Sequence, residues 1–327
     1  MKKTLIALAV LGLSGAAMAQ SSVTLYGVAD AGVGKINPTA QDGLFGSLGI
    51  GGAGPDSSNK KTQFISGSRM NNGDSRLGVR DVEDLGGGMK AGVNIETGLD
   101  LNSGGTLNYS GGGYWGRLAN VWVSGDWGSV KLGRQYTGSY VGALVYELTG
   151  GANYSVLGST YNYAEGMRVN SAFAYSAPTF NGLTVGGGCV SKNDVGLNAC
   201  DAGAVYFTGP LKVAAVVSKT SETTATYEFG AKYDFDNFVL AASFTQASVP
   251  GTHLVRRGGE LGGTAKFGAF SVTLDLTRDT KNEWVSRKYT NGLLELKYTL
   301  SKRTFVYAAY LRLDSTNNYS LGINHSF

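Results

Sequence analysis

The chain has 327 residues and a formal net charge of +4; 16% of its residues are charged, 50 are glycine and only 5 are proline. High glycine with little proline and 11% aromatic residues excludes a disordered or collagen-like chain. Beyond the N-terminus no window holds about 18 consecutive apolar residues, which excludes a helical membrane protein.

The first segment has the pattern of a secretory signal peptide. Lysines stand at positions 2–3, an apolar run covers 5–13, and a small-x-small cleavage site ends at Ala19. We therefore predict a signal peptide over 1–19 and an exported mature chain over 20–327. Without its two lysines the chain has 26 basic and 24 acidic residues, a net charge of +2. With no basic stripe either, nucleic acid is not an expected partner.

Beyond this segment, apolar and polar residues alternate, as is typical of β-strands. In the segment 75–82, Leu77 and Val79 share one face and Arg76 and Arg80 the other. Similar alternation occurs over residues 89–96, 168–176, 211–218, 304–314 and 320–327. No long pattern of period 3.6 follows the signal peptide, so the mature chain is predicted to be all-β.

Short turns and longer polar or glycine-rich stretches alternate along the chain. The seven turns lie at 85–88, 125–128, 180–182, 209–210, 234–237, 268–269 and 300–303, and the eight longer stretches at 36–61, 100–115, 137–167, 191–200, 219–225, 248–258, 279–287 and 314–318. Fifteen alternating connections join sixteen strands, which is typical of bacterial outer-membrane barrels. We predict a 16-stranded antiparallel transmembrane β-barrel with short periplasmic turns, long extracellular loops and an aqueous channel.

Two cysteines, Cys189 and Cys200, lie in the exported part, where a disulfide is the expected state. The residues between them are rich in Asn, Asp and Gly, so a bridge would join the two sides of a loop base. The alternative, a pair of metal ligands, lacks nearby histidines or further cysteines. No metal or other cofactor is expected.

Five segments together resemble the trimeric general porins of Gram-negative bacteria, in the branch found in β-proteobacteria. They are residues 23–30, 75–86, 127–135, 168–178 and 321–327, and their order and spacing carry the resemblance. It implies a homotrimer in the outer membrane, surrounded by lipid and lipopolysaccharide, that passes ions and small hydrophilic solutes. It also implies that the third loop, residues 137–167, folds into the barrel, and that the barrel-assembly machinery recognises the terminal Phe327.

Charges on the loop and on the wall predict the ion preference of such a channel. Glu147 and Glu165 lie in the third loop, and parity places Asp30 on the inner wall. The predicted basic side of the constriction comprises Arg76, Arg80, Lys90, Lys131, Arg134 and Arg168. Other inward charges by parity are Lys212, Lys232, Lys297, Arg312, Glu96, Asp234, Asp275, Glu295 and Asp314. Bases outnumber acids, so we expect a weak anion preference.

Arg134 shares its parity with Val130 and Leu132, which are assigned to the lipid face. The resemblance places an arginine at this position, so we expect an irregularity at Gly133 or a contact between subunits. Arg80-Asp81 departs from the resemblance, since members often have Lys-Gly there, and this departure affects the charge of the constriction.

Other functions stay open. A substrate-selective channel for phosphate or small organic anions would use the same barrel, and the loops could serve as an adhesin or a receptor. A barrel enzyme needs a histidine beside a serine or aspartate. His253 and His325 fit a loop and a membrane-boundary position, and no G-x-S-x-G motif occurs, so no catalytic residue is predicted. The G-x-G-x-x-G match at 49–54 lacks the flanking strand and helix of a nucleotide site.

Overall fold

The structure is a computed structural model that describes residues 22–39, 41–42, 44, 61–107, 113–164, 166–192 and 196–327. The predicted signal peptide and the glycine-rich segment at 49–54 lie outside the described residues.

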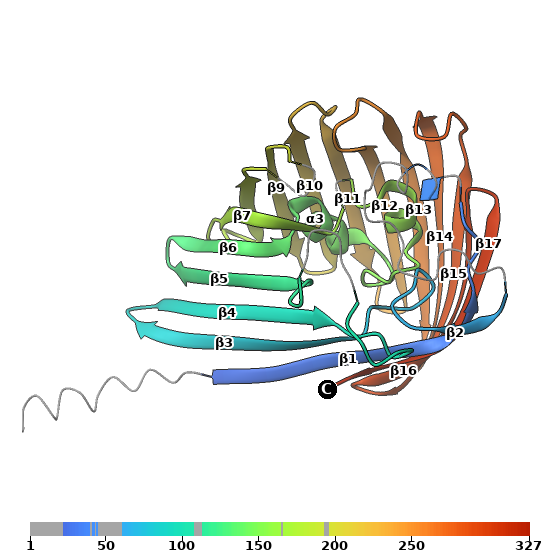
Figure 1. Ribbon diagram of the computed structural model, residues 1–327, viewed down its shortest axis with the longest axis horizontal. Coiled ribbons are helices and arrows are strands. Elements are labelled where there is room, and N and C mark those ends of the chain that lie inside the picture. Colours follow the sequence, from blue (N-terminus) through green and yellow to red (C-terminus); the bar gives the residue numbers. More distant parts are fainter. Residues whose placement is uncertain are drawn as a thin grey trace, which may run out of the picture.

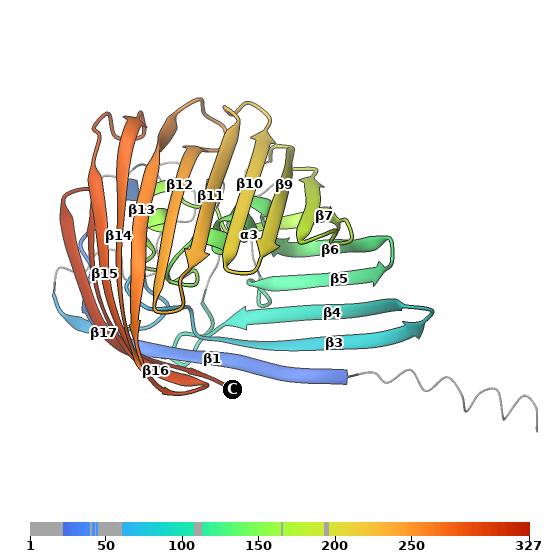
Figure 2. The same cartoon turned by 180° about the vertical axis from the view of Figure 1, so that it is seen from behind.

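Sixteen long strands form one closed antiparallel sheet in the described part of the chain, and the three-residue strand β2 pairs with β1. The strands are β1 (Ser22–Lys35), β2 (Gln63–Ile65), β3 (Arg76–Gly86), β4 (Met89–Gly98), β5 (Leu118–Gly125), β6 (Gly128–Tyr136), β7 (Arg168–Ser176), β8 (Leu183–Val190), β9 (Ala199–Thr208), β10 (Leu211–Thr220), β11 (Thr226–Asp234), β12 (Phe238–Ser248), β13 (Val255–Phe267), β14 (Phe270–Asn282), β15 (Thr290–Ser301), β16 (Thr304–Leu313) and β17 (Thr316–Ser326). The predicted 16-stranded antiparallel barrel is therefore confirmed (Figures 1 and 2).

The two ends of the chain close the ring. The first half of β1 pairs with β3, and its second half pairs with β17. Beyond β17, the N–H of Phe327 donates to the carbonyl of Gly27 at 3.0 Å, and the N–H of Gly27 donates to the carbonyl of Phe327 at 3.1 Å. The ring of Phe327 occupies the space where a side chain on Gly27 would start. The C-terminus lies beside β1 (Figure 1).

The burial pattern identifies the inner face, which strand parity alone does not settle. In β14, Leu274 and Leu276 are exposed on the outside, whereas Asp275 and Thr277 are buried inside. β17 has the same arrangement, with Leu321 exposed and Asn324 buried. Exposed apolar residues form the outer surface on most strands, as a barrel embedded in lipid requires.

β16 reverses this contrast and corrects one prediction. Its inward residues are apolar, and Arg312 points outward and is exposed, so the expectation that Arg312 faces the channel is wrong. The reason is that Leu311 and Leu313 do not meet water inside the barrel. They pack in an apolar cluster with Met70 and Tyr154, which come from loops that cover this part of the wall.

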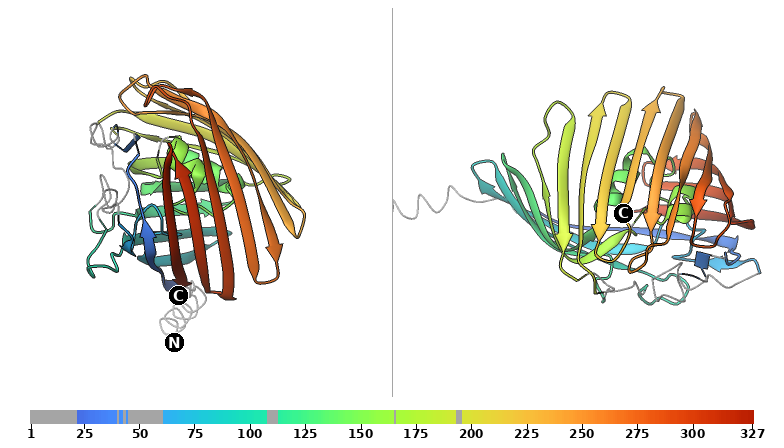
Figure 3. Two further views of the ribbon diagram at one scale, coloured as in Figure 1. Left: turned by 90° about the vertical axis from the view of Figure 1, so that its right-hand side faces the viewer. Right: turned by 90° about the horizontal axis from the view of Figure 1, so that it is seen from above.

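The third loop carries two short helices, α3 (Gly138–Tyr146) and α4 (Val156–Tyr161). Each helix is capped by a hydroxyl: Thr137 Oγ1 accepts from the N–H of Tyr140, and Ser155 Oγ accepts from the N–H of Gly158. α3 packs against β9–β12 and α4 against β12–β16, so both helices lie inside the barrel (Figure 3). Neither is long and apolar enough to span a membrane.

Candidate channel and its charged lining

The third loop is anchored to one half of the barrel wall by three side chains. Lys232 Nζ donates to the carbonyl of Glu147 at 2.7 Å, and Lys297 Nζ donates to the carbonyl of Thr149 at 3.2 Å. The hydroxyl of Tyr154 donates to Glu295 Oε2 at 2.6 Å. Lys232 and Lys297 were predicted to face the channel, and the structure has them holding carbonyl groups of the loop.

The middle of the loop also binds the segment between β2 and β3. Asn153 Nδ2 donates to Asp74 Oδ1 at 2.8 Å and to the carbonyl of Ser68 at 3.0 Å. Asn72 Nδ2 donates to the hydroxyl of Tyr154 at 2.8 Å. Together with the helix contacts to β9–β16, these bonds hold the loop across the interior.

Several tyrosines of the loop are buried with their hydroxyl groups neutral. Burial, with the neighbouring Tyr136, raises the pKa of Tyr140 to about 12. Burial is also the main cause that raises the pKa of Tyr154 and of Tyr163 well above the usual value, and nearby carboxylates add to it. The loop therefore depends on neutral tyrosines for its packing and its hydrogen bonds.

Two acids predicted for the constriction, Asp30 and Glu147, are fully buried. Asp30 accepts from Asn71 Nδ2 at 2.9 Å, from the hydroxyl of Tyr307 at 2.7 Å and from Asn324 Nδ2 at 2.8 Å. The Glu147 carboxylate accepts from backbone N–H groups of its own loop. Their bonds are internal to the fold, so these acids contribute little to the surface of the channel; Glu165 lies outside the described residues.

Arg76 belongs to a charge-balanced network at the long-loop end of β3 and β4. Its Nε lies 3.7 Å from Glu96 Oε2. Arg117, which precedes β5 and was not identified from the sequence, lies 2.5 Å from Glu96 Oε1 and 2.6 Å from Asp74 Oδ2. The hydroxyl of Tyr26 also donates to Glu96 Oε2, at 3.0 Å. Two arginines thus balance two acids here.

Three other predicted cations, Arg80, Lys90 and Lys131, are exposed on the inner face of β3, β4 and β6. Within the described ranges none of them has a carboxylate at ion-pair distance. The Arg80 guanidinium lies 5.9 Å from the ring centroid of Tyr26. Asp84 is the register partner of Lys90, so the local excess is two positive charges. These cations lie on strands other than β9–β16, against which the helices of the third loop pack.

Arg134 and Arg168 lie where the third loop begins and ends. A register irregularity occurs between β6 and β7 at Gly133, which has φ 115°, so the expected irregularity is present. Arg134 is buried and donates to the carbonyl of Gly116 at 2.7 Å and to Asn170 Oδ1 at 2.6 Å. The Arg168 guanidinium lies 5.1 Å from the ring centroid of Tyr136. Arg134 supports the loop base rather than an open wall.

At the long-loop end, the fully buried Arg256 joins segments that are distant in the sequence. It pairs with Asp279 at 3.0 Å and with Asp314 at 2.8 Å, and its Nη1 donates to Gln41 Oε1 at 2.6 Å. The rings of Tyr161 and Trp284 lie within cation–π range. The sequence gives one signal for this site, because Arg256 has the inward parity of β13.

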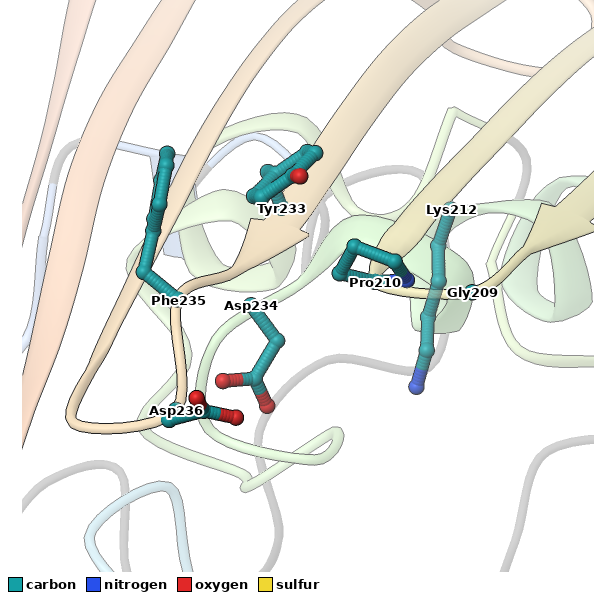
Figure 4. A pocket seen from close by; sticks show the side chains of 7 residues that line it. All are labelled: Gly209, Pro210, Lys212, Tyr233, Asp234, Phe235 and Asp236. Carbon is teal, nitrogen blue, oxygen red and sulfur yellow. The ribbon is translucent and has the colours of Figure 1, made fainter.

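The remaining inward charges are mostly paired or buried. Asp275 and Glu295 are buried, and Asp234 forms an ion pair with Lys266 at 2.8 Å. Lys212 and Asp234 lie in a pocket of about 700 Å³ at the short-turn end, where Tyr233 and Phe235 supply aromatic rings (Figure 4). The other residues of this pocket are Gly209, Pro210 and Asp236. With acids and a base together, the pocket has no strong preference for either sign of charge.

Cys189 and Cys200 form a disulfide between directly opposite residues of β8 and β9. Both residues are exposed, and they have the outward parity of their strands.

His253 is exposed in a loop, and His325 Nδ1 lies 2.9 Å from Thr304 Oγ1. Within the described ranges, no group of three or more His, Cys, Asp or Glu side chains could hold a metal ion.

Comparison with known proteins gives consistent matches. A family model described as Gram-negative porin matches residues 4–318. Outer membrane porin protein 32 of Delftia acidovorans is 31% identical over 258 residues, which are 75% of this chain and 66% of that protein. An outer membrane porin protein of Bordetella pertussis is 28% identical over the full length of both chains.

Solved structures share the fold. An anion-selective porin from Comamonas acidovorans has a TM-score of 0.72 and 23% identity, and the match covers 94% of this chain and all of that one. The trimer form of OmpT, an outer membrane protein of Vibrio cholerae, has a TM-score of 0.67 and 14% identity, covering 94% of this chain and 99% of that one.

Proposed function

Because this chain belongs to the family of Gram-negative porins, we propose that its channel prefers anions weakly and that three copies assemble around one axis. The protein is an outer-membrane porin, a water-filled barrel through which ions and small hydrophilic solutes diffuse passively. Its relatives are channels, and the proposal includes no catalytic step and no cofactor.

The observation that carries the anion preference is the imbalance of accessible charge on the inner wall. Arg80, Lys90 and Lys131 are exposed there without an ion-pair partner in the described part of the chain. By contrast, Asp30 and Glu147 are fully buried. An unpaired cation on the wall of a channel raises the local concentration of anions.

Three further assignments complete the proposal. Residues 1–19 direct export and are removed, so the mature chain is 20–327. The trimer sits in lipid and lipopolysaccharide, which the exposed apolar outer face supports. The exposed ring of Phe327, at the point where the barrel closes, is the part of the chain that the barrel-assembly machinery recognises.

A reversal-potential measurement tests the preference. Purified trimers in a planar bilayer under a KCl gradient should give a potential of the sign that favours chloride. The triple variant Arg80→Gln, Lys90→Gln, Lys131→Gln should move this potential to zero or beyond, because it removes the accessible positive charge.

The matched control removes three lysines that do not line the channel. Lys35 and Lys219 have outward parity, and Lys302 lies in the β15–β16 turn. Their triple change to Gln alters the net charge equally and should leave the potential nearly unchanged at about 0.1 M salt, where charges act over about 10 Å. A cation-favouring potential of the unaltered protein would refute the proposal.

A further inference from the structure

Trp122 gives the channel wall an aromatic surface that the passage of small ions does not require. It has the inward parity of β5, two residues after the buried Asn120, while its neighbour Val121 is exposed on the outside. Its indole atoms Cζ2 and Cε2 lie 2.6 and 2.7 Å from the position that a Cβ on Gly92 would take. The ring therefore lies across the backbone of β4 and stays partly exposed to the interior.

Two accessible cations flank this ring. Lys131 on β6 is the register partner of Trp122, which puts their Cβ atoms about 5 Å apart on the same face. Lys90 is the diagonal neighbour on β4, one inward position from Gly92. Both lysines are exposed, and neither has a carboxylate at ion-pair distance among the described residues.

The neighbours in the same row of the wall are small. Gly92 lies on one side of Trp122, and Ala174 and Gly188 follow Lys131 on the other side. α3 meets this row at Asp201 of β9, the register partner of Gly188, whose Oδ2 accepts from the N–H of Gly138 at 2.9 Å. Asp201 lies three strands from Lys131, about 14 Å at the usual strand spacing. Between them the row carries the small residues Ala174 and Gly188, which leaves space for a flat molecule beside the indole.

This combination selects one class of solute. An aromatic ring stacks on an indole face, and a carboxylate on that ring can pair with an ammonium group about 5 Å from the stacking surface. A cationic ligand, which the indole alone would also attract, is repelled by Lys131 and Lys90. We propose that Trp122 and Lys131, with Lys90, form a transient binding site for small aromatic carboxylates inside the channel.

This inference rests on the proposed anion channel and names a solute class for it. The experiment compares three probes of similar size on the trimer in a planar bilayer: benzoate, cyclohexanecarboxylate, which lacks the aromatic ring, and benzamide, which lacks the charge. The reduction of chloride current with rising probe concentration gives an apparent affinity for each probe. We expect benzoate to bind about two- to ten-fold more tightly than cyclohexanecarboxylate, the range for one aromatic contact. Benzoate should also bind more tightly than benzamide, because benzoate alone of these two carries the charge that pairs with Lys131.

Variants assign the effect to the side chains. Trp122→Leu should abolish the preference for benzoate over cyclohexanecarboxylate, and Trp122→Phe should restore part of it. Lys131→Gln should reduce the difference between benzoate and benzamide. Trp127→Leu is the matched control, because Trp127 lies exposed in the β5–β6 turn, and it should behave as the unaltered protein.

The outcomes separate the two proposals. Equal affinities for benzoate and cyclohexanecarboxylate in the unaltered protein would overturn the binding site even if Trp122→Leu failed to fold. Equal affinities for benzoate and benzamide would overturn the role of Lys131. The KCl reversal potential is measured on the same channels, so a cation preference would count against the anion channel itself, and an anion preference without discrimination would count against the site alone.

Discussion

A carboxylate inside this barrel contributes to the charge of the channel if water reaches it, and to the stability of the fold if it is buried. Asp30 has the inward parity expected of a channel acid, but it is completely buried and accepts three side-chain hydrogen bonds from residues far apart in the chain. A buried acceptor with several donors stabilises the fold, and its removal leaves each donor unsatisfied.

We therefore expect Asp30→Ala to lower the free energy of unfolding by about 3 kcal/mol and to leave ion preference unchanged. Urea unfolding in detergent measures the free energy of unfolding, and the reversal potential measures the ion preference. Asp30→Asn is the control, because it keeps the shape and part of the bonding and should cost less. A changed reversal potential with an unchanged free energy of unfolding would show that Asp30 acts on the ions in the channel and not on the stability of the fold.

At the scale of elements, alternation was enough to predict the barrel, because most strands separate an apolar outer face from a more polar inner one. It failed for Arg312, because β16 is covered from inside by apolar loop residues, so the contrast between faces reverses. The short helices of the third loop escaped a search for long helical periodicity, although Thr137 and Ser155 stand at capping positions.

The channel lining was only partly predictable for a related reason. Parity identifies Arg80, Lys90 and Lys131 correctly as inward residues, but it cannot distinguish an accessible cation from one bound to a loop carbonyl, such as Lys232. That distinction depends on where the third loop lies, which contacts between distant residues determine. Trp122 could have been found, since its parity matches that of Asn120 and Ser124.

We expect the third loop to detach from the barrel wall in strongly alkaline solution. An unpacked tyrosine ionises near pH 10, whereas burial raises the pKa of Tyr140 to about 12 and shifts Tyr154 and Tyr163 in the same direction. A pKa raised by docking means that the docked state is fully favoured below about pH 10 and loses stability as the pH rises toward about 12.

Tyrosinate absorbance and channel current, recorded together across this range, check this expectation. The current should stay steady up to about pH 10, and its fluctuations should then increase while the buried tyrosines ionise. Tyr140→Phe should remove one of the late-ionising groups from the titration. Steady current after full ionisation would show that neutral tyrosines do not hold the loop.

For the whole molecule, Arg256 connects β13 with the ends of β14 and β16 and with the first loop. Replacement by Met leaves Asp279 and Asp314 buried without a cation, so we expect a loss of about 3–5 kcal/mol in stability. Faster proteolysis of the long loops should accompany this loss of stability.

Arg257→Met, at the adjacent outward position, is the control and should have little effect in the same urea and protease assays. Adding Asp279→Asn and Asp314→Asn to the Met variant should recover part of the loss, and no recovery would show that charge is not the cause.

The seam between β1 and β17 also bears on how the barrel forms. Val28 pairs with Ser326, so the two edges that meet are separated by almost the entire chain. Neighbouring strands can form hairpins early, since their connections are short, but joining the first strand to the last incurs the loop-closure entropy of the whole polypeptide. Closure is therefore the step of highest contact order. Until it occurs, the unpaired N–H and C=O groups of both edge strands can pair with another chain, which leads to aggregation. We expect an external catalyst to accelerate folding most at this seam, by holding the last strand until the first one arrives.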